Sequence, residues 1–523
     1  MPRTYDLNDD AVVVVIGSGA GGGTLSNELA RKGIDVVCLE AGPRTELGEF
    51  RNDEPYMNAK LTWRDPREGS GDASRNNPTF VCKTVGGTTV HWTALALRMK
   101  EQETRALTTY GSMPEADLID WPIAFDELSH YYGLAEAKLG VAGTHDMPRF
   151  DGSNNYHVLN AGAMKLGFPH TPTANLAINS VPYDGRAACR QSGFCRSGCI
   201  YSAKWSTLYT EIPKAEATGH FELRPDAMVL KIDQREDGRV TGVVYQDESG
   251  NIVHQAARAV AVAGNAVETA RLLLNSASQR SPDGLGNQNG LVGRYYMRHV
   301  FGFVAARMPG QVNMFKGIVQ MGSLEHQAHH DPGRGFASGY HIETVSMSPS
   351  GLTRLLVPHE GWGEDFAEAM EDYRNFAAAM MCGEDFPEAT NRVTLHDSRI
   401  DRYGLPIPKV HYVRSENSWA MAEHGLSHIE DIFDAVGATK TYRTPRTGSI
   451  GTATHNLGTA RMASSEEQGV CDPWGNVYGV PNLYVSDGSL FPTSMTANPT
   501  LTIVALAIRQ ADHIEQQMTA RVL

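Results

Sequence analysis

The sequence predicts an α/β protein, α+β overall, with a Rossmann-like nucleotide-binding domain assembled from discontinuous segments and a sheet-and-helix substrate domain. Residues 11–16 form a continuous apolar run that leads into the glycine-rich stretch from Gly17 to Gly22. This is the order of a buried strand and a phosphate-binding turn. Near the other end, the strand-like residues 482–487 precede a helical pattern from Pro499 to Gln516. Because both ends carry such units, we expect both to contribute to one domain.

Length and charge narrow the possible classes of protein. With 523 residues, the chain is long enough for two or more domains. Its net charge of -14 at pH 7 repels phosphate backbones, so nucleic acid is not an expected partner. No stretch reaches the roughly 18 apolar residues of a spanning helix, and the N-terminal residues lack a signal-peptide pattern. We therefore expect a soluble protein without direct membrane insertion, either cytoplasmic or carried to the periplasm or membrane by a partner.

Periodicity predicts the following elements in order. Helices are expected at residues 20–32, 125–139 and 266–275, and strands at 35–39 and in three runs within 221–263. Residues 143–200 are rich in Gly, Pro, Asn and Asp, which favours a loop. Residues 46–80 show no clear period, and residues 300–450 mix strands and helices with weaker periodicity.

The expected domains follow from this order of elements. The nucleotide-binding domain is expected to combine residues 8–105, 215–300 and 451–523. Residues 106–214 are expected to form a helical and loop region that contains three clustered cysteines, and residues 301–450 to form the substrate-binding domain.

The glycine-rich stretch has the features of a dinucleotide site. Gly17 permits a tight turn, Gly19 lets a pyrophosphate approach the backbone, and Gly22 lets the helix lie close to the strand. The free N–H groups at the helix start then face the phosphates. Glu40 ends the second strand, where a carboxylate accepts hydrogen bonds from ribose hydroxyls. This pattern predicts a dinucleotide but does not separate FAD from NAD.

Three further blocks resemble signatures of the glucose–methanol–choline oxidoreductase family. The first, Val85 to Trp92, resembles the flavin-contacting loop, and the second, Ala263 to Leu273, resembles a second signature of that family. The third consists of 455–459, 482–489 and 498–500, and it resembles the C-terminal active-site block. The resemblance runs from about residue 10 to the end and is weakest from about residue 300 to 380.

The resemblance implies FAD as the cofactor, and it gives roles to individual residues. Glu40 is then expected to hold the adenosine ribose, and the backbone of Val229 to meet the adenine. The loop containing Gly86, Gly87 and Thr88 is expected to approach the flavin and pyrophosphate. Asp487 matches a position beside the ribityl and phosphate region of the flavin.

His91 matches a loop of special interest. His91-Trp92-Thr93 resembles the covalent-flavin loop of pyranose oxidases. Two roles therefore stay open for His91: a bond to the 8α-methyl carbon of the flavin, or a contact beside a non-covalent flavin.

By the same resemblance, His455 and Asn498 match the catalytic pair of the family. A histidine suits the removal of a hydroxyl proton because its unperturbed pKa lies near 6.5. Asn498 cannot act as a base, but it can orient the substrate hydroxyl, and it is also expected to cap the helix that begins at Pro499. The N–H group of Thr500, at the positive end of that helix, is expected to face the flavin.

Three of the seven cysteines, Cys189, Cys195 and Cys199, lie in one glycine-containing loop. Three thiolates can hold an iron–sulfur cluster, whereas structural zinc normally takes four ligands. The spacing resembles the loop of bacterial FAD-dependent glucose dehydrogenase catalytic subunits, which implies a [3Fe-4S] cluster. Zinc and metal-free reduced thiols are the alternatives.

These features together predict a bacterial FAD-dependent dehydrogenase. It is expected to oxidise a hydroxyl of a sugar or glycoside by hydride transfer to flavin N5, and to pass electrons through the cluster to a cytochrome or small escort subunit. The alternative is an oxygen-using sugar oxidase of the pyranose 2-oxidase or glycoside 3-oxidase type. A non-catalytic flavoprotein subunit is disfavoured because both His455 and Asn498 are present. Residues such as His341 are candidates for substrate contact.

Overall fold

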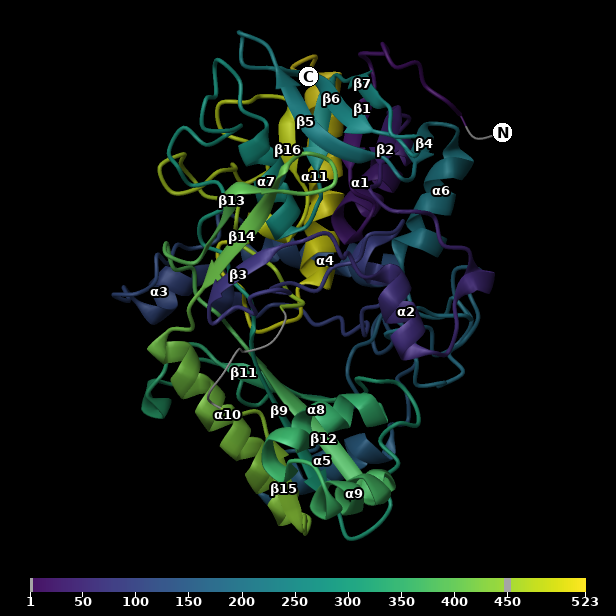
Figure 1. Ribbon diagram of the computed structural model, residues 1–523, viewed down its shortest axis with the longest axis vertical. Helices are drawn as coiled ribbons and strands as arrows, with labels where there is room; N and C mark the ends of the chain where they lie inside the picture. The colour runs from purple at the N-terminus through teal and green to yellow at the C-terminus, as the bar shows by residue number, and fades with distance from the viewer. Residues whose placement is uncertain (1–2, 446–452) are drawn as a thin grey trace.

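The structure is a computed structural model that describes residues 3–445 and 453–523. The upper part of Figure 1 contains a five-stranded, fully parallel sheet in the order β16-β8-β1-β2-β4. Its strands are β1 (Val13–Ile16), β2 (Val36–Leu39), β4 (Phe221–Arg224), β8 (Ala259–Val262) and β16 (Leu483–Val485). These segments lie far apart in the sequence, so the Rossmann-like sheet is assembled from discontinuous segments as predicted.

Both faces of this sheet are covered, which explains the unbroken apolar run at residues 11–16. Val13 and Val15 belong to a buried cluster with residues of the helices, whereas Val14 and Ile16 belong to a cluster on the other side. The helices near the first face are α1 (Ala20–Arg31), α6 (Glu211–Thr218) and α11 (Thr500–Thr519), with α4 (Phe125–Leu139) against α11. Toward the second face lie α7 (Ala266–Asn275) and an antiparallel sheet of β5 (Met228–Gln234), β6 (Val240–Gln246) and β7 (Ile252–Ala256).

The lower part of Figure 1 is built on a five-stranded antiparallel sheet in the order β10-β11-β12-β9-β15. Its strands are β9 (Val300–Arg307), β10 (Ser323–Leu324), β11 (Tyr340–Thr344), β12 (Phe376–Gly383) and β15 (Lys440–Arg443). Helices α5 (Asn154–Lys165) and α10 (Glu416–Ala435) contact this sheet and each other. Helices α8 (Pro349–Glu360) and α9 (Glu364–Glu371) contact each other beside it.

The prediction of a loop throughout residues 143–200 is wrong at α5. Ser153 caps this helix, and Leu159 and Ala163 are buried in the core of the antiparallel sheet. Its polar residues, which favoured a loop, are used in tertiary bonds: the Asn155 amide donates to the carbonyl of Ala378 and accepts from its N–H, both at 2.9 Å. Tertiary contacts thus outweigh the local preference for a loop.

A fourth sheet, of β3 (Glu68–Gly71), β13 (Arg392–Ile400) and β14 (Pro406–Tyr412), lies between the upper and lower parts of the molecule in Figure 1. β13 and β14 lie within the segment expected to form the substrate domain, but they contact α7 beside the parallel sheet. The predicted boundary between residues 450 and 451 lies outside the described residues. The short helices α2 (Glu54–Leu61) and α3 (Ala106–Tyr110) are the remaining α-helices of the described residues. No helix within the described ranges combines the length and apolar character needed to cross a bilayer.

Candidate active site and cofactor cavity

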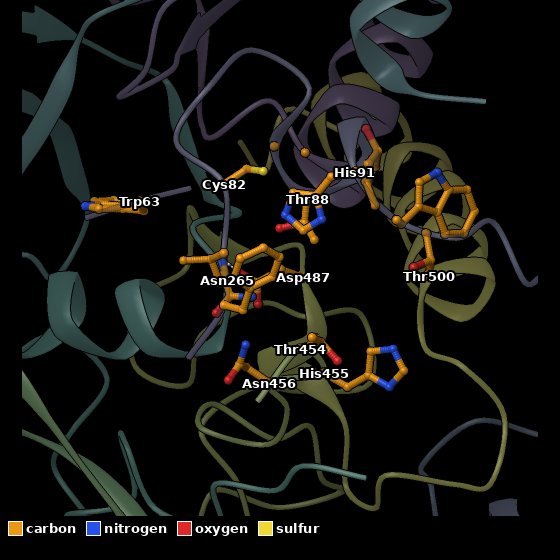
Figure 2. Close-up of a pocket in the computed structure, with 18 of the residues that line it drawn as sticks. Trp63, Cys82, Thr88, His91, Asn265, Thr454, His455, Asn456, Asp487 and Thr500 are labelled. Carbon is orange, nitrogen blue, oxygen red and sulfur yellow. Dashed lines mark hydrogen bonds between the residues drawn. The ribbon is translucent and has the colours of Figure 1, made fainter. Parts of the chain in front are cut away.

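A cavity of about 1010 Å³ receives wall residues from both large sheets and from the loops between them. Of the residues predicted for cofactor binding and catalysis, its walls include Gly17, Gly19, Glu40, Gly87, Thr88, His91, Val229, His455, Asp487, Asn498 and Thr500. Figure 2 shows Thr88 and His91 on one side of the open space and His455 on the other, with Asp487 between them. Segments from the whole length of the chain therefore meet at one site.

The glycine-rich turn is shaped by close backbone approach. Gly17 has a φ of +97°, and a Cβ there would lie 2.4 Å from the carbonyl oxygen of Ala263. A Cβ on Gly22 would lie 2.0 Å from the Gly17 carbonyl oxygen, so Gly22 serves packing and does not line the cavity. A Cβ on Gly19 would meet no atom closer than the Gly87 Cα, at 3.9 Å. This geometry leaves the Gly19 backbone accessible from the cavity.

The Glu40 carboxylate ties this turn to the second strand. Its Oε2 accepts hydrogen bonds from the Ser18 N–H at 3.0 Å and the Ser18 hydroxyl at 2.7 Å, and its Oε1 accepts from the Gly42 N–H at 3.0 Å. Burial raises the pKa of Glu40 above its ordinary value, while these donors oppose that shift. A carboxylate has about four lone-pair sites, so three bonds leave room for a ligand hydroxyl.

The loop from Gly86 to His91 lies beside the glycine-rich turn, where the Gly86 N–H donates to the Ser18 hydroxyl at 2.9 Å. Gly86 and Gly87 both have positive φ, at 91° and 50°, which lets the chain turn sharply; Gly86 itself lies outside the cavity lining. The His91 ring lies 4.6 Å from the Phe80 ring, and its Nε2 has no hydrogen-bond partner among the described residues. Burial lowers the pKa of His91 to about 3, so the imidazole is neutral. One ring nitrogen thus remains available beside the cavity.

Asp487 holds the start of α7. Its Oδ2 accepts from the Asn265 N–H at 2.9 Å and from the Thr269 hydroxyl at 2.6 Å, and its Oδ1 accepts from the Ser489 N–H at 2.8 Å. The carboxylate is therefore already bonded within the protein, and it fixes the wall formed by Asn265 and its neighbours.

Asn498 does not cap α11, contrary to expectation. The helix begins at Thr500 after Pro499, with no side-chain capping bond. The Asn498 amide instead donates from Nδ2 to Oε1 of Glu343 at 3.0 Å. The cause is the buried Glu343 carboxylate, whose bond with Asn498 turns the amide away from the helix start.

His455 lies in the same cavity and contacts a second histidine. Its Nδ1 lies 3.0 Å from Nδ1 of His299, and the two rings meet edge to face. Burial lowers the pKa of His455 to about 4, although the negative charge of Glu343 acts in the opposite direction. Burial and the neighbouring His455 also lower the pKa of His299. Both imidazoles are therefore neutral near neutral pH.

Sequence reasoning missed His299, Gln320 and Glu343, all of which lie where the resemblance is weakest. Gln320 and Glu343 line the cavity, whereas His341 does not. The His341 Nε2 instead lies 2.7 Å from Oε1 of Glu343. Only for Glu343 did the sequence offer a signal: it lies two residues after His341, and residues two apart on a strand face the same side.

Cys189, Cys195 and Cys199 line one small cavity of their own. The Gln191 N–H approaches the Cys189 sulfur at 3.3 Å. None of the other described residues that line this cavity is a cysteine, histidine, aspartate or glutamate, so it offers three ligands of these types. The structure therefore brings the three predicted cysteines together.

The cysteine loop contacts the loop of His91 through a buried lysine. The Lys204 ammonium donates to the carbonyl oxygens of Val90, Trp92 and Cys195 at 2.9, 2.7 and 2.6 Å. Arg196, which follows Cys195, lines the large cavity. The small cysteine cavity and the large cavity are thus joined by direct contacts.

Comparison with known proteins supports this arrangement. Residues 13–300 match the N-terminal model and residues 387–507 the C-terminal model of the GMC oxidoreductases. The chain is 32% identical to 2-methyl-1,2-propanediol dehydrogenase of Mycolicibacterium austroafricanum, over 98% of this chain and 96% of that protein. It is 29% identical to the fructose dehydrogenase large subunit of Gluconobacter japonicus, over 96% and 97%. The fold is similar to formate oxidase of Aspergillus oryzae RIB40, with a TM-score of 0.69 and 16% identity over 98% and 99% of the two chains.

Proposed function

The chain belongs to the GMC oxidoreductase family, and on this premise we propose that it is an FAD-dependent dehydrogenase that oxidises a hydroxyl of a sugar or glycoside and passes the electrons to a partner protein. The observation that carries the proposal is the convergence of a dinucleotide turn and the His455–Asn498 pair on one cavity. The substrate class is supported by relatives named for a diol and for fructose.

The residues of the cavity fit FAD. Glu40 retains a lone pair for a ribose hydroxyl, the Gly19 backbone is accessible, and Thr500 begins a helix whose first N–H groups are free. The positive end of that helix dipole stabilises negative charge placed before it. Bound FAD supplies an N5 atom that accepts a hydride.

His455 is the proposed base. Its Nδ1 is occupied by His299, which leaves Nε2 as the nitrogen that can take the substrate's hydroxyl proton. For this, the His455 Nδ1 must carry a hydrogen atom, and it must donate a hydrogen bond to the lone pair of His299 Nδ1. Because burial keeps His299 neutral, that lone pair is available, and the contact fixes the tautomer that the reaction needs.

Three arguments support a [3Fe-4S] cluster at Cys189, Cys195 and Cys199. The three share one cavity, the described residues of that cavity offer no fourth ligand of the kind zinc prefers, and a backbone N–H approaches one sulfur. Such a cluster carries one electron at a time and suits transfer to a cytochrome or small escort subunit.

The first experiment tests the base. His455→Ala should slow anaerobic flavin reduction by about 10²–10⁴-fold, since general base catalysis contributes that much. Rapid mixing with saturating substrate follows flavin bleaching apart from electron transfer to an acceptor, and FAD content is the control. Reduction at the wild-type rate across the pH range would show that His455 is not the base.

The second experiment tests the cluster. In protein prepared without oxygen, Cys195→Ser should remove iron and acid-labile sulfide while FAD remains. Substrate should still bleach the flavin, but transfer to the partner should slow. Wild-type protein without iron, whose reduced flavin reacts rapidly with oxygen, would instead indicate a sugar oxidase.

The role of His91 is tested by acid precipitation. We propose that His91 contacts the flavin, because its unpaired Nε2 adjoins the cavity. A yellow supernatant after precipitation indicates a non-covalent contact, whereas a yellow pellet indicates a bond between His91 and the flavin. His91→Ala should abolish any covalent attachment.

A further inference from the structure

The wall of the large cavity contains a carboxylate that makes three hydrogen bonds to side chains. Glu343 is fully buried, and its Oε1 accepts from Asn498 Nδ2 at 3.0 Å and from His341 Nε2 at 2.7 Å. Its Oε2 accepts from Gln320 Nε2. A buried carboxylate needs such donors, because an unpaired charge away from water is strongly destabilising.

These bonds fix the orientation of two amides. An amide oxygen turned toward a carboxylate would place acceptor against acceptor, so the NH₂ ends of Asn498 and Gln320 must face Glu343. Their oxygen ends, Asn498 Oδ1 and Gln320 Oε1, have no hydrogen-bond partner among the described residues. The two side chains are only 7% and 4% exposed, and both residues line the cavity. An unpaired buried oxygen is costly, so a ligand that supplies donors is favoured.

We propose that Glu343 is a positioning residue that presents Asn498 Oδ1 and Gln320 Oε1 to the substrate, so that the site selects compounds with a hydroxyl next to the one oxidised. This inference rests on the proposed function, in which His455 takes the proton of the reacting hydroxyl. The two amide oxygens then accept hydrogen bonds from neighbouring hydroxyls. Gln320 thereby becomes a specificity-determining residue for vicinal diols and other polyols.

The proposal predicts discrimination between matched alcohols. A site built to bond a hydroxyl rejects an analogue that lacks it, because its buried acceptors are left unpaired. Propane-1,2-diol and glycerol should therefore reduce the flavin with a second-order rate constant at least about tenfold higher than that of propan-1-ol. Anaerobic rapid mixing measures all three on the complete, FAD-loaded protein.

Two variants test the residues. Gln320→Met keeps the length of the side chain but removes its acceptor, so the rate with propane-1,2-diol should fall about ten- to a hundredfold relative to the rate with propan-1-ol. Glu343→Gln places an NH₂ group opposite the amides of Asn498 and Gln320. One of these amides must then turn its oxygen toward residue 343 and away from the substrate, so the preference for the diol should fall in the same way. Gln288→Met, at an exposed site, is the matched control.

The ratio of diol to monohydric rates separates specificity from structural damage, because loss of folded protein lowers both rates equally. FAD content and the thermal midpoint monitor folding. If wild-type protein reduces its flavin equally with propane-1,2-diol and propan-1-ol, or if Gln320→Met and Glu343→Gln both keep the wild-type ratio, the inference is overturned. If neither these alcohols nor any sugar reduces the wild-type flavin, the proposed function itself fails, and the inference with it.

Discussion

The chemistry of His455 depends on where the chain places it. A histidine in water has a pKa near 6.5, but burial lowers that of His455 to about 4. Its Nδ1 is held by His299, and the amide of Asn498 is held by Glu343. Each member of the pair is therefore oriented by a buried side chain. Glu343 lies in β11 of the antiparallel sheet, and His299 comes directly before β9 of the same sheet.

The lowered pKa gives a pH prediction. A base acts only when it is deprotonated, so activity is lost as the pH falls through its pKa. We expect kcat/KM for flavin reduction to be constant from about pH 5 to 8 and to decline as the pH falls through about 4. The residual activity of His455→Ala should lack this decline. A midpoint near 6.5 in the wild type would contradict the burial argument.

The sequence could point to His455 and Asn498, the proposed catalytic pair, but not to the residues that orient them. His455 and Asn498 lie in local motifs that can be matched one by one, as do Gly17 and Glu40. Glu343 has no such motif: its role arises because β11 carries it to a point where Gln320 and Asn498 also meet, and Asn498 is 155 residues away. Pairing of distant segments determines such contacts, and periodicity within one segment does not reveal them.

At the scale of elements, the packing of α1 against the parallel sheet depends on glycine. A Cβ on Gly21 would lie 1.7 Å from the carbonyl oxygen of Ser486, next to the Asp487 carboxylate. The helix can start this close to β16 only without a side chain there. The same approach places the first turn of α1 at the cavity wall, so packing and cofactor binding depend on one contact.

We therefore expect Gly21→Ala to destabilise the fold by at least about 1–3 kcal/mol, because overpacking moves backbone, and to weaken FAD binding. Gly133→Ala in α4 is the control: nothing lies within 4 Å of its Cβ, and alanine in a helix is favoured by roughly 0.5–1 kcal/mol. Thermal unfolding and FAD release measure both. An equal midpoint for the two variants would show that α1 can shift without cost.

At the scale of the whole molecule, the contacts between its two large sheets include buried acids as well as apolar groups. Glu384, just after β12, accepts a hydrogen bond from the Met495 N–H at 3.2 Å, in the segment that leads to Asn498 and α11. It also accepts from the Tyr110 hydroxyl at 3.0 Å. Glu103 accepts from the Thr496 N–H at 2.7 Å. Two carboxyl groups thus hold the segment that leads to Asn498.

These acids make stability depend on pH. Burial and the charge of Glu103 raise the pKa of Glu384 to about 8. The folded protein keeps this proton up to about pH 8, whereas the unfolded chain loses it near the ordinary value of 4.5. The stabilising contribution of the protonated group is therefore complete below about pH 4.5 and is lost as the pH rises toward and through 8.

Glu384→Gln should remove much of this pH dependence, because a glutamine keeps hydrogen-bonding groups at the site and cannot ionise. Thermal midpoints measured from pH 5 to 9 should fall less steeply in Glu384→Gln than in the wild type, and the variant should be the more stable of the two above pH 8. Glu248→Gln, in an exposed turn between β6 and β7, should keep the wild-type slope. Parallel curves for Glu384→Gln and the wild type would mean that ionisation of Glu384 does not contribute to the pH dependence of stability.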